Sequence, residues 1–352
     1  MHRPAMALLT GDPAPTFALP GVNNPRYVFD TAAGRYLLLA IVPAGAAVAR
    51  AVETIQARRP LFNDHHASAF VVIVGRDEDR ETRKDAVPGL RFLFDEDAAV
   101  AARYDAAKAE RWILIDPALH IMSMVGADQA ATLVERMAAL PPPARHAGPE
   151  VSAPVLMTPR IFEPAFCEQL IALYRHVGGA PSGFMREVDG VTTLVMSDQH
   201  KRRSDVLIED GDLQNQVVAR LTRRLLPQIQ KAFHYKATRI ERYLVARYDG
   251  ETGGFFRPHR DNTTKGTAHR QFAVSINLNA DFEGGDLRFP EFGPRTYRPP
   301  PGGAVVFSCS VLHEATAVTK GERFAFLPFL YDDAAAEIRQ ANLKFLDPVL
   351  TT

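Results

Sequence analysis

Cysteine is scarce in this sequence, because Cys167 and Cys309 are the two present among 352 residues. They form no CxxC pair and no cluster with histidine, so neither a disulfide framework nor a structural zinc site is expected. Both are interpreted as small buried hydrophobes. A reducing, cytoplasmic setting is the corresponding prediction.

The sequence also lacks a charge excess and a long apolar run. Lys+Arg and Asp+Glu both number 41, so the formal net charge is +0. A neutral chain without a basic stripe and interleaved aromatics is not expected to bind nucleic acid. The apolar run at 5–9 is shorter than a secretory h-region of roughly 7–15 residues, and no run reaches the roughly 20 residues of a membrane span. No membrane association is expected.

A run of three prolines, Pro141-Pro142-Pro143, marks a division of the chain. Such a run cannot continue a helix or a central strand, and it is extended and stiff. A single core stops growing at roughly 250–300 residues, so two domains are expected. We predict a first domain at 1–139, a linker at 140–154 and a second domain at 155–352.

The first domain alternates apolar strand patterns with helical ones, which predicts an α/β unit. Its two longest apolar runs are typical of strands buried on both faces of a parallel-type sheet. Strands are predicted at 36–42, 69–74, 112–116 and 120–125, and helices at 46–58 and 127–139.

The second domain has helices first and many short strands afterwards. The strongest helical pattern runs over 212–233, and Pro227 should bend or break it. This order predicts an α+β domain, a helix-supported β-sandwich or jelly roll. A further helix is predicted at 164–176, and strands at 239–246, 272–279, 286–289, 304–307 and 323–330.

Two histidines and one aspartate carry the functional prediction. His259 and Asp261 are two residues apart, so in an extended strand both side chains point to the same face. His313 follows His259 by 54 residues, beyond several predicted strands. Two imidazoles and one carboxylate leave coordination positions open, which is typical of non-haem Fe(II) oxygenases. We predict that these three catalytic residues bind iron.

Arg323 follows His313 by ten residues and should begin a strand after the turn at Lys320-Gly321-Glu322. A buried guanidinium binds a carboxylate through two parallel hydrogen bonds. Arg323 is therefore predicted to anchor the distal carboxylate of a 2-oxo acid, with Lys320 as the alternative.

Residues 155–332 resemble the prolyl 4-hydroxylase-like group of 2-oxoglutarate/Fe(II) oxygenases. The resemblance implies a double-stranded β-helix (jelly-roll) core. It rests on ordered motifs: Tyr248-Asp249-Gly250, Phe255-Phe256-Arg257-Pro258-His259-Arg260-Asp261-Asn262, Ser275-Ile276-Asn277-Leu278-Asn279, Phe282-Glu283-Gly284-Gly285-Asp286-Leu287, Pro301-Gly302-Gly303-Ala304-Val305-Val306-Phe307, Leu312-His313-Glu314 and Lys320-Gly321-Glu322-Arg323.

The resemblance implies an enzyme that decarboxylates 2-oxoglutarate to succinate and CO₂ and hydroxylates a C–H bond. Its cofactors and co-substrates would be Fe(II), 2-oxoglutarate and O₂, with ascorbate. The substrate would be an amino acid, a peptide with a prolyl or other side chain, or a small metabolite. Tyr248 is implied to bind 2-oxoglutarate beside Arg323. Asn277 stands where some members have a second co-substrate tyrosine.

Residues 8–138 resemble the peroxiredoxin branch of the thioredoxin fold, through Gly11-Asp12-Pro13-Ala14-Pro15-Thr16-Phe17, Pro43, Phe94-Asp95-Glu96-Asp97 and Ile115-Asp116-Pro117. The family's PxxxTxxC motif corresponds to residues 43–50, where Ala47 replaces threonine and Arg50 replaces cysteine. Peroxide reduction needs a thiolate. The resemblance thus implies a degenerate, α/β thioredoxin-like domain that serves as a scaffold, in homo-oligomer formation or in substrate presentation.

Alternatives remain at two points. The chain could be a non-catalytic iron or 2-oxoglutarate sensor whose redoxin-like domain recruits a partner. The cluster Lys201-Arg202-Arg203 is interpreted as a solvated face, with contact to an acidic substrate as the alternative. The substrate-binding rim is predicted at 178–210 and 262–270.

Overall fold

The computed structural model describes residues 7–348; residues 1–6, which include the start of the apolar run at 5–9, lie outside this range. The chain divides into two compact units, each with its own hydrophobic core. Unit 1 is Met1–Ala153 with Pro290–Pro294, and unit 2 is Pro154–Phe289 with Arg295–Thr352. In the described range, no helix combines the length and apolar character that a membrane crossing needs.

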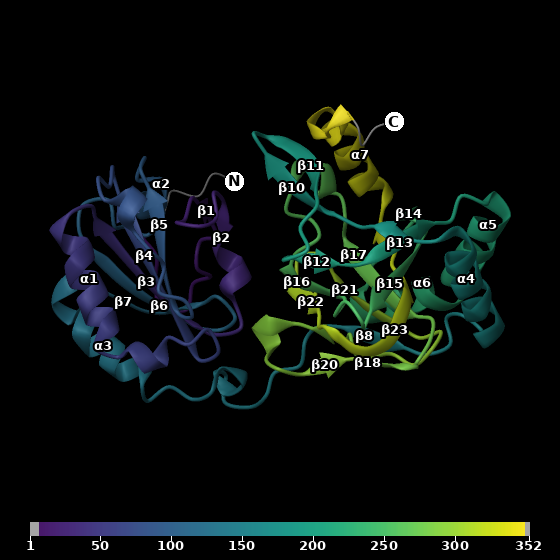
Figure 1. The fold of residues 1–352 in the computed structure, drawn as a ribbon, viewed down its shortest axis with the longest axis horizontal. Helices are drawn as coiled ribbons and strands as arrows, with labels where there is room; N and C mark the ends of the chain where they lie inside the picture. Colours follow the sequence, from purple (N-terminus) through teal and green to yellow (C-terminus); the bar gives the residue numbers. More distant parts are fainter. Residues whose placement is uncertain (1–6, 349–352) are drawn as a thin grey trace. The chain divides into compact units, whose positions relative to one another are not determined.

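Unit 1 is built around a five-stranded sheet in the order β5-β4-β3-β6-β7. The helices α1 and α3 lie side by side against this sheet, and their apolar residues join its core (Figure 1). The elements are β1 (Ala18–Leu19), β2 (Tyr27–Val28), β3 (Tyr36–Pro43), α1 (Ala46–Gln56), β4 (Ala67–Val74), β5 (Leu90–Asp95), α2 (Ala99–Arg103), β6 (Arg111–Ile115), β7 (Ile121–Val125) and α3 (Ala130–Met137).

The two longest apolar runs, β3 and β4, pair in parallel as predicted, but the sheet of unit 1 as a whole is mixed. β3 and β4 pair in parallel, as do β4 and β5, but β6 is antiparallel to both β3 and β7. A central strand buried on both faces is apolar throughout in either orientation, so the pattern could not separate them. Strand β5 was not predicted. Arg50, at the position of the absent thiol, is exposed on α1 and pairs with Glu110 at 2.9 Å.

The helices of unit 2 between Pro164 and Phe233 pack against one face of its larger sheet. The stripe predicted over 212–233 is real, with Leu213, Val217, Leu221 and Ile229 buried in the core. Its path is interrupted by a π-helical turn at Leu221–Leu225, after which Pro227 is the second residue of the next helix. Proline lacks an N–H, so it fits best in a first turn. The helices are α4 (Pro164–Val177), α5 (Gly211–Arg220), α6 (Leu226–Phe233) and the unpredicted α7 (Asp333–Asn342).

Unit 2 contains a ten-stranded sheet, a five-stranded sheet in the order β12-β16-β22-β19-β20, and the hairpin β10-β11. The strands are β8 (Leu156–Thr158), β9 (Ala180–Pro181), β10 (Phe184–Val188), β11 (Val191–Val195), β12 (Lys201–Arg202), β13 (Ser204–Leu207), β14 (Arg239–Glu241), β15 (Leu244–Asp249), β16 (Phe255–His259), β17 (Phe272–Asn277), β18 (Phe282–Gly284), β19 (Leu287–Arg288), β20 (Thr296–Tyr297), β21 (Ala304–Ser308), β22 (His313–Ala315), β23 (Val318–Phe326) and β24 (Phe329–Tyr331).

The large sheet of unit 2 is covered on both faces. Val245 of β15 packs in the core shared with the helices, whereas its neighbours Leu244 and Ala246 pack with Phe256 of the small sheet. Successive residues of a strand point to opposite faces. One face of the large sheet therefore meets the helices and the other meets the small sheet (Figure 1).

Two local predictions need correction, and the substrate-binding rim stays a prediction. Strand β16 ends at His259, so Asp261 lies in a turn beyond the strand and not within it. Strand β23 begins at Val318 and runs through Gly321, so Arg323 is inside the strand rather than at its start. Gly321 permits this continuation because its φ is +71° and an added Cβ would lie 2.2 Å from the Asp281 carbonyl oxygen. The predicted rim at 178–210 is largely the strands β9 to β13.

Candidate metal centre

His259, Asp261 and His313 converge in unit 2. His259 and His313 are register partners on the adjacent strands β16 and β22, and Asp261 follows the end of β16. One ligand atom from each residue lies within 4.8 Å of the other two, and no other such group occurs within residues 7–348. The His259 Nε2 and the His313 Nε2 lie 3.6 Å and 3.3 Å from the two Asp261 carboxylate oxygens. Three donors therefore face one point.

The backbone determines which imidazole nitrogen is available in each histidine. The Nδ1 of His259 lies 2.7 Å from the Arg257 carbonyl oxygen, and that of His313 lies 3.0 Å from the Val311 carbonyl oxygen. A carbonyl oxygen only accepts hydrogen bonds, so each Nδ1 must carry the proton. Each Nε2 therefore presents a lone pair towards Asp261, which is the orientation that metal-binding histidines need.

Aromatic rings enclose the two histidines. Phe256 stacks on the His259 ring at a centroid distance of 3.5 Å, and Phe307 lies 4.5 Å from the His313 ring. Burial and the neighbouring His313 lower the pKa of His259 well below its ordinary value, although its bond to the Arg257 carbonyl opposes the shift. The neutral form of His259, which binds metals, is therefore favoured.

A buried polar network holds the backbone around Asp261. The Asp261 N–H donates to the Cys309 carbonyl at 3.0 Å, and the Arg270 Nη1 donates to the Asp261 carbonyl at 3.4 Å. Arg270 also binds Glu241 through Nη2 at 2.6 Å, and the Nε2 of His269 lies 2.7 Å from the same carboxylate. His269 thus has a structural role in this network.

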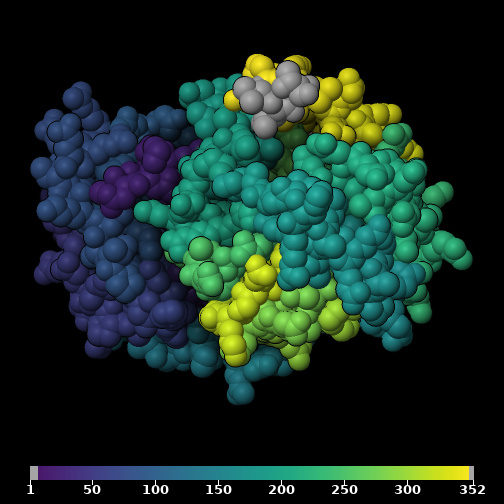
Figure 2. All heavy atoms as spheres, turned by 45° about the vertical axis from the view of Figure 1, so that its right-hand side comes forward, coloured from purple at the N-terminus to yellow at the C-terminus, as the bar shows by residue number. Residues whose placement is uncertain are grey.

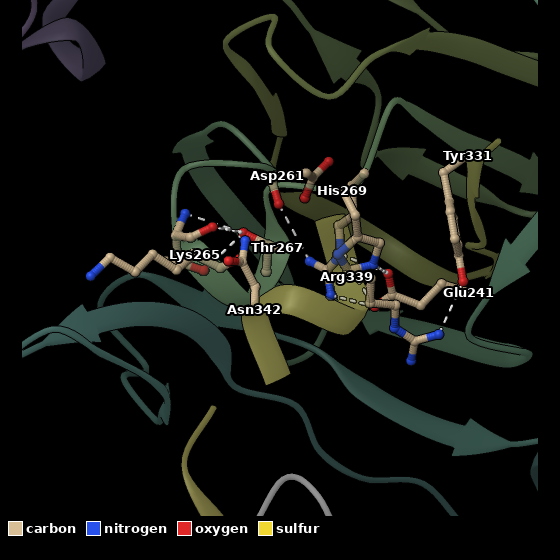
Figure 3. A network of polar contacts seen from close by, with 10 residues as sticks. Glu241, Asp261, Lys265, Thr267, His269, Tyr331, Arg339 and Asn342 are labelled. Carbon is tan, nitrogen blue, oxygen red and sulfur yellow. Dashed lines mark hydrogen bonds and ion pairs between the residues drawn. The ribbon is translucent and has the colours of Figure 1, made fainter. Parts of the chain in front are cut away.

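The C-terminal helix α7 extends the network to the segment 262–270 (Figure 3). Arg339 donates to the Tyr331 hydroxyl at 3.0 Å, and the Tyr331 ring packs on His269 with centroids 5.0 Å apart. Asn342 donates to the Lys265 carbonyl at 2.8 Å. Figure 2 shows the yellow C-terminal segment at the surface of unit 2. The Glu241 network and helix α7 thus both contact the segment that follows Asp261.

Arg323 and Tyr248 lie on the same face of the large sheet. They are register partners on β23 and β15, and the Arg323 guanidinium carbon is 5.2 Å from the Tyr248 ring centre. Tyr248 packs in the cluster that includes Phe256, the ring stacked on His259. Burial lowers the pKa of Arg323, but its value near 12.5 in water keeps it charged at neutral pH. A buried cation thus lies on the face that meets the small sheet.

Ser275 and Asn277 orient Arg323, and the motif analysis did not assign them this contact. Arg323 donates from Nε to the Asn277 Oδ1 at 3.0 Å and from Nη2 to the Ser275 Oγ at 2.7 Å. Both are two per cent exposed and alternate along β17 with Val274 and Ile276, which pack against the helices. The period of two, read along Ser275-Ile276-Asn277, could have placed both polar residues on the co-substrate face. Lys320 is exposed and pairs with Glu283 at 3.3 Å, so it does not compete with Arg323 for a buried site.

The cluster Lys201-Arg202-Arg203 is not a solvated face, which corrects that interpretation. Lys201 is 5% exposed and the Arg203 side chain is 4% exposed, whereas Arg202 points to solvent. Lys201 lies on β12, the edge strand of the small sheet, where its register partner is Phe256. A cavity of ≈ 340 Å³ also opens on unit 2, lined by Gly253, Phe255, Arg257, Glu314, Ala315, Thr316 and Ala317; the three converging residues are not part of it.

Residues 243–331 match the 2OG-Fe(II) oxygenase superfamily. The matched segment contains Tyr248, the two histidines with Asp261, and Arg323. Unit 2 therefore carries a 2OG-Fe(II) oxygenase domain. Members of this class are dioxygenases that use Fe(II), 2-oxoglutarate and O₂, and the His-Asp-His group supplies the donor set for the metal.

Within that class, the similar relatives are hydroxylases. A PKHD-type hydroxylase of Shewanella oneidensis is 27% identical over 175 residues, which are 47% of this chain and 76% of the relative. A multifunctional procollagen lysine hydroxylase and glycosyltransferase of Caenorhabditis elegans is 26% identical over 176 residues, or 47% of this chain. The match spans 22% of the length of the nematode relative.

Some solved structures resemble part of this chain. A prolyl-4-hydroxylase of Pseudomonas putida covers 51% of this chain and 94% of its own, with 20% identity and a TM-score of 0.40. A thiol:disulfide interchange protein DsbE of Chlorobium tepidum, described as putative, covers 38% of this chain and 98% of its own, with 19% identity and a TM-score of 0.33. At TM-scores below 0.5, neither similarity defines a shared fold.

Proposed function

We propose that this protein is a 2-oxoglutarate-dependent hydroxylase, with Fe(II) bound by His259, Asp261 and His313. The observation that carries the proposal is the convergence of two Nε2 lone pairs and one carboxylate within 4.8 Å. In the neutral form of each imidazole, with its proton on Nδ1, no hydrogen bond to Asp261 explains this convergence. A divalent cation fits the donor set because it satisfies all three groups at once.

When bound, the iron would supply the oxidative chemistry that decarboxylates 2-oxoglutarate to succinate and CO₂ and hydroxylates a substrate C–H bond. The chain's own contribution is to bind, orient and exclude water. The Arg257 and Val311 carbonyls orient the two imidazoles, while Phe256 and Phe307 shield them. Ascorbate is proposed as an accessory reductant, because the related hydroxylases imply it.

Arg323 is proposed to bind the distal carboxylate of 2-oxoglutarate, with Tyr248 beside it. The contacts to Ser275 and Asn277 use Nε and Nη2, so the guanidinium is oriented before a ligand arrives. A preoriented planar cation binds a carboxylate with little loss of side-chain entropy. Asn277 thereby acts on the co-substrate by orienting Arg323, and not by binding the co-substrate itself as the tyrosine of some family members does.

The two units are proposed to have different ancestries. The two sheets of unit 2 and their shared face support a double-stranded β-helix (jelly-roll) core. The mixed sheet of unit 1, with helices against it, supports a degenerate peroxiredoxin-like domain that acts as a scaffold, in homo-oligomer formation or in substrate presentation. We propose a cytoplasmic protein acting on an amino-acid, peptidyl or small-metabolite substrate; its two cysteines are buried and unpaired.

The test is oxidative decarboxylation of 2-oxoglutarate by the full-length protein. Purified protein would be loaded anaerobically with Fe(II), the bound iron would be quantified, and succinate would be measured after air is admitted. Slow succinate formation without added substrate is expected, and it should disappear in the His313→Ala variant. His176→Ala, which changes an exposed histidine on α4, is the matched control.

The same assay separates the hydroxylase from the iron or 2-oxoglutarate sensor. A sensor would bind the metal and the co-substrate, as followed by calorimetry, without producing succinate. Full iron occupancy combined with an absence of succinate, in the presence of ascorbate and a cell lysate as a substrate source, would contradict the hydroxylase proposal.

A further inference from the structure

Lys201 and Arg242 are cations of unit 2 that form no ion pair among the described residues. Lys201 is 5% exposed, and its Nζ donates to the Ser182 Oγ at 2.7 Å and to the Gly183 carbonyl at 2.5 Å, both neutral groups. Among the described residues, the Nε of Arg242 is buried without a hydrogen-bond partner. An ammonium has three N–H donors and a guanidinium has five, so donors remain at both residues.

Lys201 lies one aromatic ring away from the metal-binding group, and Arg242 shares a ring with Arg270, which contacts Asp261. The Lys201 Nζ is 4.9 Å from the centre of the Phe256 ring, which stacks on His259 at 3.5 Å. The Arg242 guanidinium carbon is 4.2 Å from the centre of the Phe329 ring. The Arg270 guanidinium carbon is 4.1 Å from the same ring, and Arg270 donates to the Asp261 carbonyl.

The nearby carboxylates already have partners. Asp205 binds Arg203 at 2.6 Å, Glu241 binds Arg270 and His269, and Asp261 belongs to the proposed iron site. Arg323 is assigned to 2-oxoglutarate. No ion pair neutralises Lys201 or Arg242, although the charge of Asp261 acts on both. An uncompensated buried charge is strongly destabilising, so such a site favours an anionic ligand.

The backbone of Arg242 also points to a ligand role. Its φ is +65°, in the left-handed region that residues with a side chain seldom adopt. This conformation precedes β15 and places the guanidinium on the Phe329 ring, between the paired Glu241 and the core. Strain of this kind persists where the surrounding structure holds it, often at ligand sites.

We propose that the hydroxylated substrate carries a carboxylate, that Arg242 binds this carboxylate beside the iron centre, and that Lys201 adds to the attraction. This inference rests on the proposed function and specifies its substrate class as a carboxylic acid, with free amino acids included. A carboxylate is favoured over a phosphate because the planar guanidinium fork, held flat on an aromatic ring, matches two carboxylate oxygens.

The test uses Mn(II) as a redox-inert paramagnetic probe in the full-length protein. With Mn(II) bound and 2-oxoglutarate saturating, the relaxation of the methyl protons of propionate would be measured by NMR. Propionamide is the neutral control of equal shape, and methylphosphonate tests the phosphate alternative. We expect enhanced relaxation for propionate that 2-oxoglutarate does not displace, and at least about tenfold less for propionamide.

The variants are Arg242→Gln and Lys201→Met, with Arg239→Gln as the control, because Arg239 is exposed and pairs only with Asp333 near α7. Arg242→Gln should reduce the affinity for propionate by about tenfold or more, Lys201→Met should reduce it by a few-fold, and Arg239→Gln should leave it unchanged. Circular dichroism would verify that each variant is folded. If Arg242→Gln is not folded, the affinity of Lys201→Met for propionate decides the question.

Several results would overturn the inference. Equal relaxation of propionate and propionamide, tighter binding of methylphosphonate, displacement of propionate by 2-oxoglutarate, or no effect of either variant would each do so. These failures differ from a failure of the proposed function. Wild-type protein that binds neither Mn(II) nor 2-oxoglutarate would contradict the hydroxylase proposal itself.

Discussion

Tyr248 and Arg323 face each other across two antiparallel strands of the large sheet, and the guanidinium carbon lies 5.2 Å from the ring centre. Val245, three residues before Tyr248, and Phe324, next to Arg323, pack with the helices on the opposite face. The alternation of the strands therefore places a buried cation and a phenol together on the side of the small sheet, where His259 and His313 lie.

Arg323→Gln should weaken 2-oxoglutarate binding. Loss of a charge-assisted hydrogen-bonded pair costs about 1.5–3 kcal/mol, which corresponds to a dissociation constant roughly 10- to 150-fold higher. Tyr248→Phe, which removes only the hydroxyl, should have a smaller effect. Calorimetric titration of the metal-loaded protein measures both. Arg239→Gln is the control, and an unchanged dissociation constant for Arg323→Gln would mean that another residue anchors the co-substrate.

Replacing any of His259, Asp261 or His313 with alanine should abolish iron retention and succinate formation. Three donors are required to hold the ion, and each variant leaves two. Iron content after gel filtration, measured by mass spectrometry, checks this. A chelator such as EDTA should remove the metal from the wild-type protein and stop turnover, and added Fe(II) should restore it. A variant that retained stoichiometric iron would contradict the assignment of the residue replaced.

Glu241→Gln should destabilise unit 2. Burial by itself would raise the pKa of Glu241, but the charge of Arg270 and hydrogen bonds from His269 and Arg270 hold it well below its ordinary value, so it is ionised. Removing one partner of a buried pair costs about 3–5 kcal/mol. The melting temperature should fall by roughly 6–20 °C, since 1 kcal/mol corresponds to about 2–4 °C in a domain of this size.

The control for Glu241→Gln is Glu283→Gln, because Glu283 forms an exposed pair with Lys320. Such pairs contribute about 0–1 kcal/mol. If both variants melted at the same temperature, the Glu241 network would contribute nothing to the stability of the segment that follows Asp261.

Asp64 should make unit 1 sensitive to acid. Burial would raise its pKa, but hydrogen bonds from Arg91 and Ser68 and the charges of Arg91 and Arg35 lower it from 3.8 to about 2. A depressed carboxyl pKa contributes stability that is present above the unfolded value near 4 and is lost as the pH falls through about 2. With allowance for solvent screening, this contribution is about 1–2 kcal/mol at neutral pH.

Asp64→Asn should therefore lower the free energy of unfolding of unit 1 at pH 7, and its difference from the wild type should vanish between pH 4 and pH 2. The single tryptophan, Trp112, is buried in β6 and reports on this unit during urea unfolding. Asp79→Asn, at an exposed carboxylate of the same unit, is the control. A difference that persisted at pH 2 would rule out the Arg91 pair as its source.

Much of the fold could be predicted from local patterns. The apolar run at 36–42 and the helix begun by Pro164 appear where the sequence indicates, because burial on both faces and a first-turn proline act within a few residues. Strand β5 and the direction of β6 were missed or misassigned. Strand pairing depends on partners far along the chain, and hydrophobic periodicity carries no information about their direction.

The candidate site likewise has a part that could be predicted from the sequence and a part that could not. The residue types and order of His259, Asp261, His313 and Arg323 were sufficient to predict an iron and 2-oxo acid site from the sequence alone, because coordination chemistry restricts which side chains can serve. The sequence could not indicate that Lys201 and Arg203 are buried, that Ser275 and Asn277 orient Arg323, or that the buried Nε of Arg242 has no hydrogen-bond partner among the described residues. Only the tertiary structure decided these points, since solvent exposure and charge compensation depend on which distant strands and rings come to lie around each side chain.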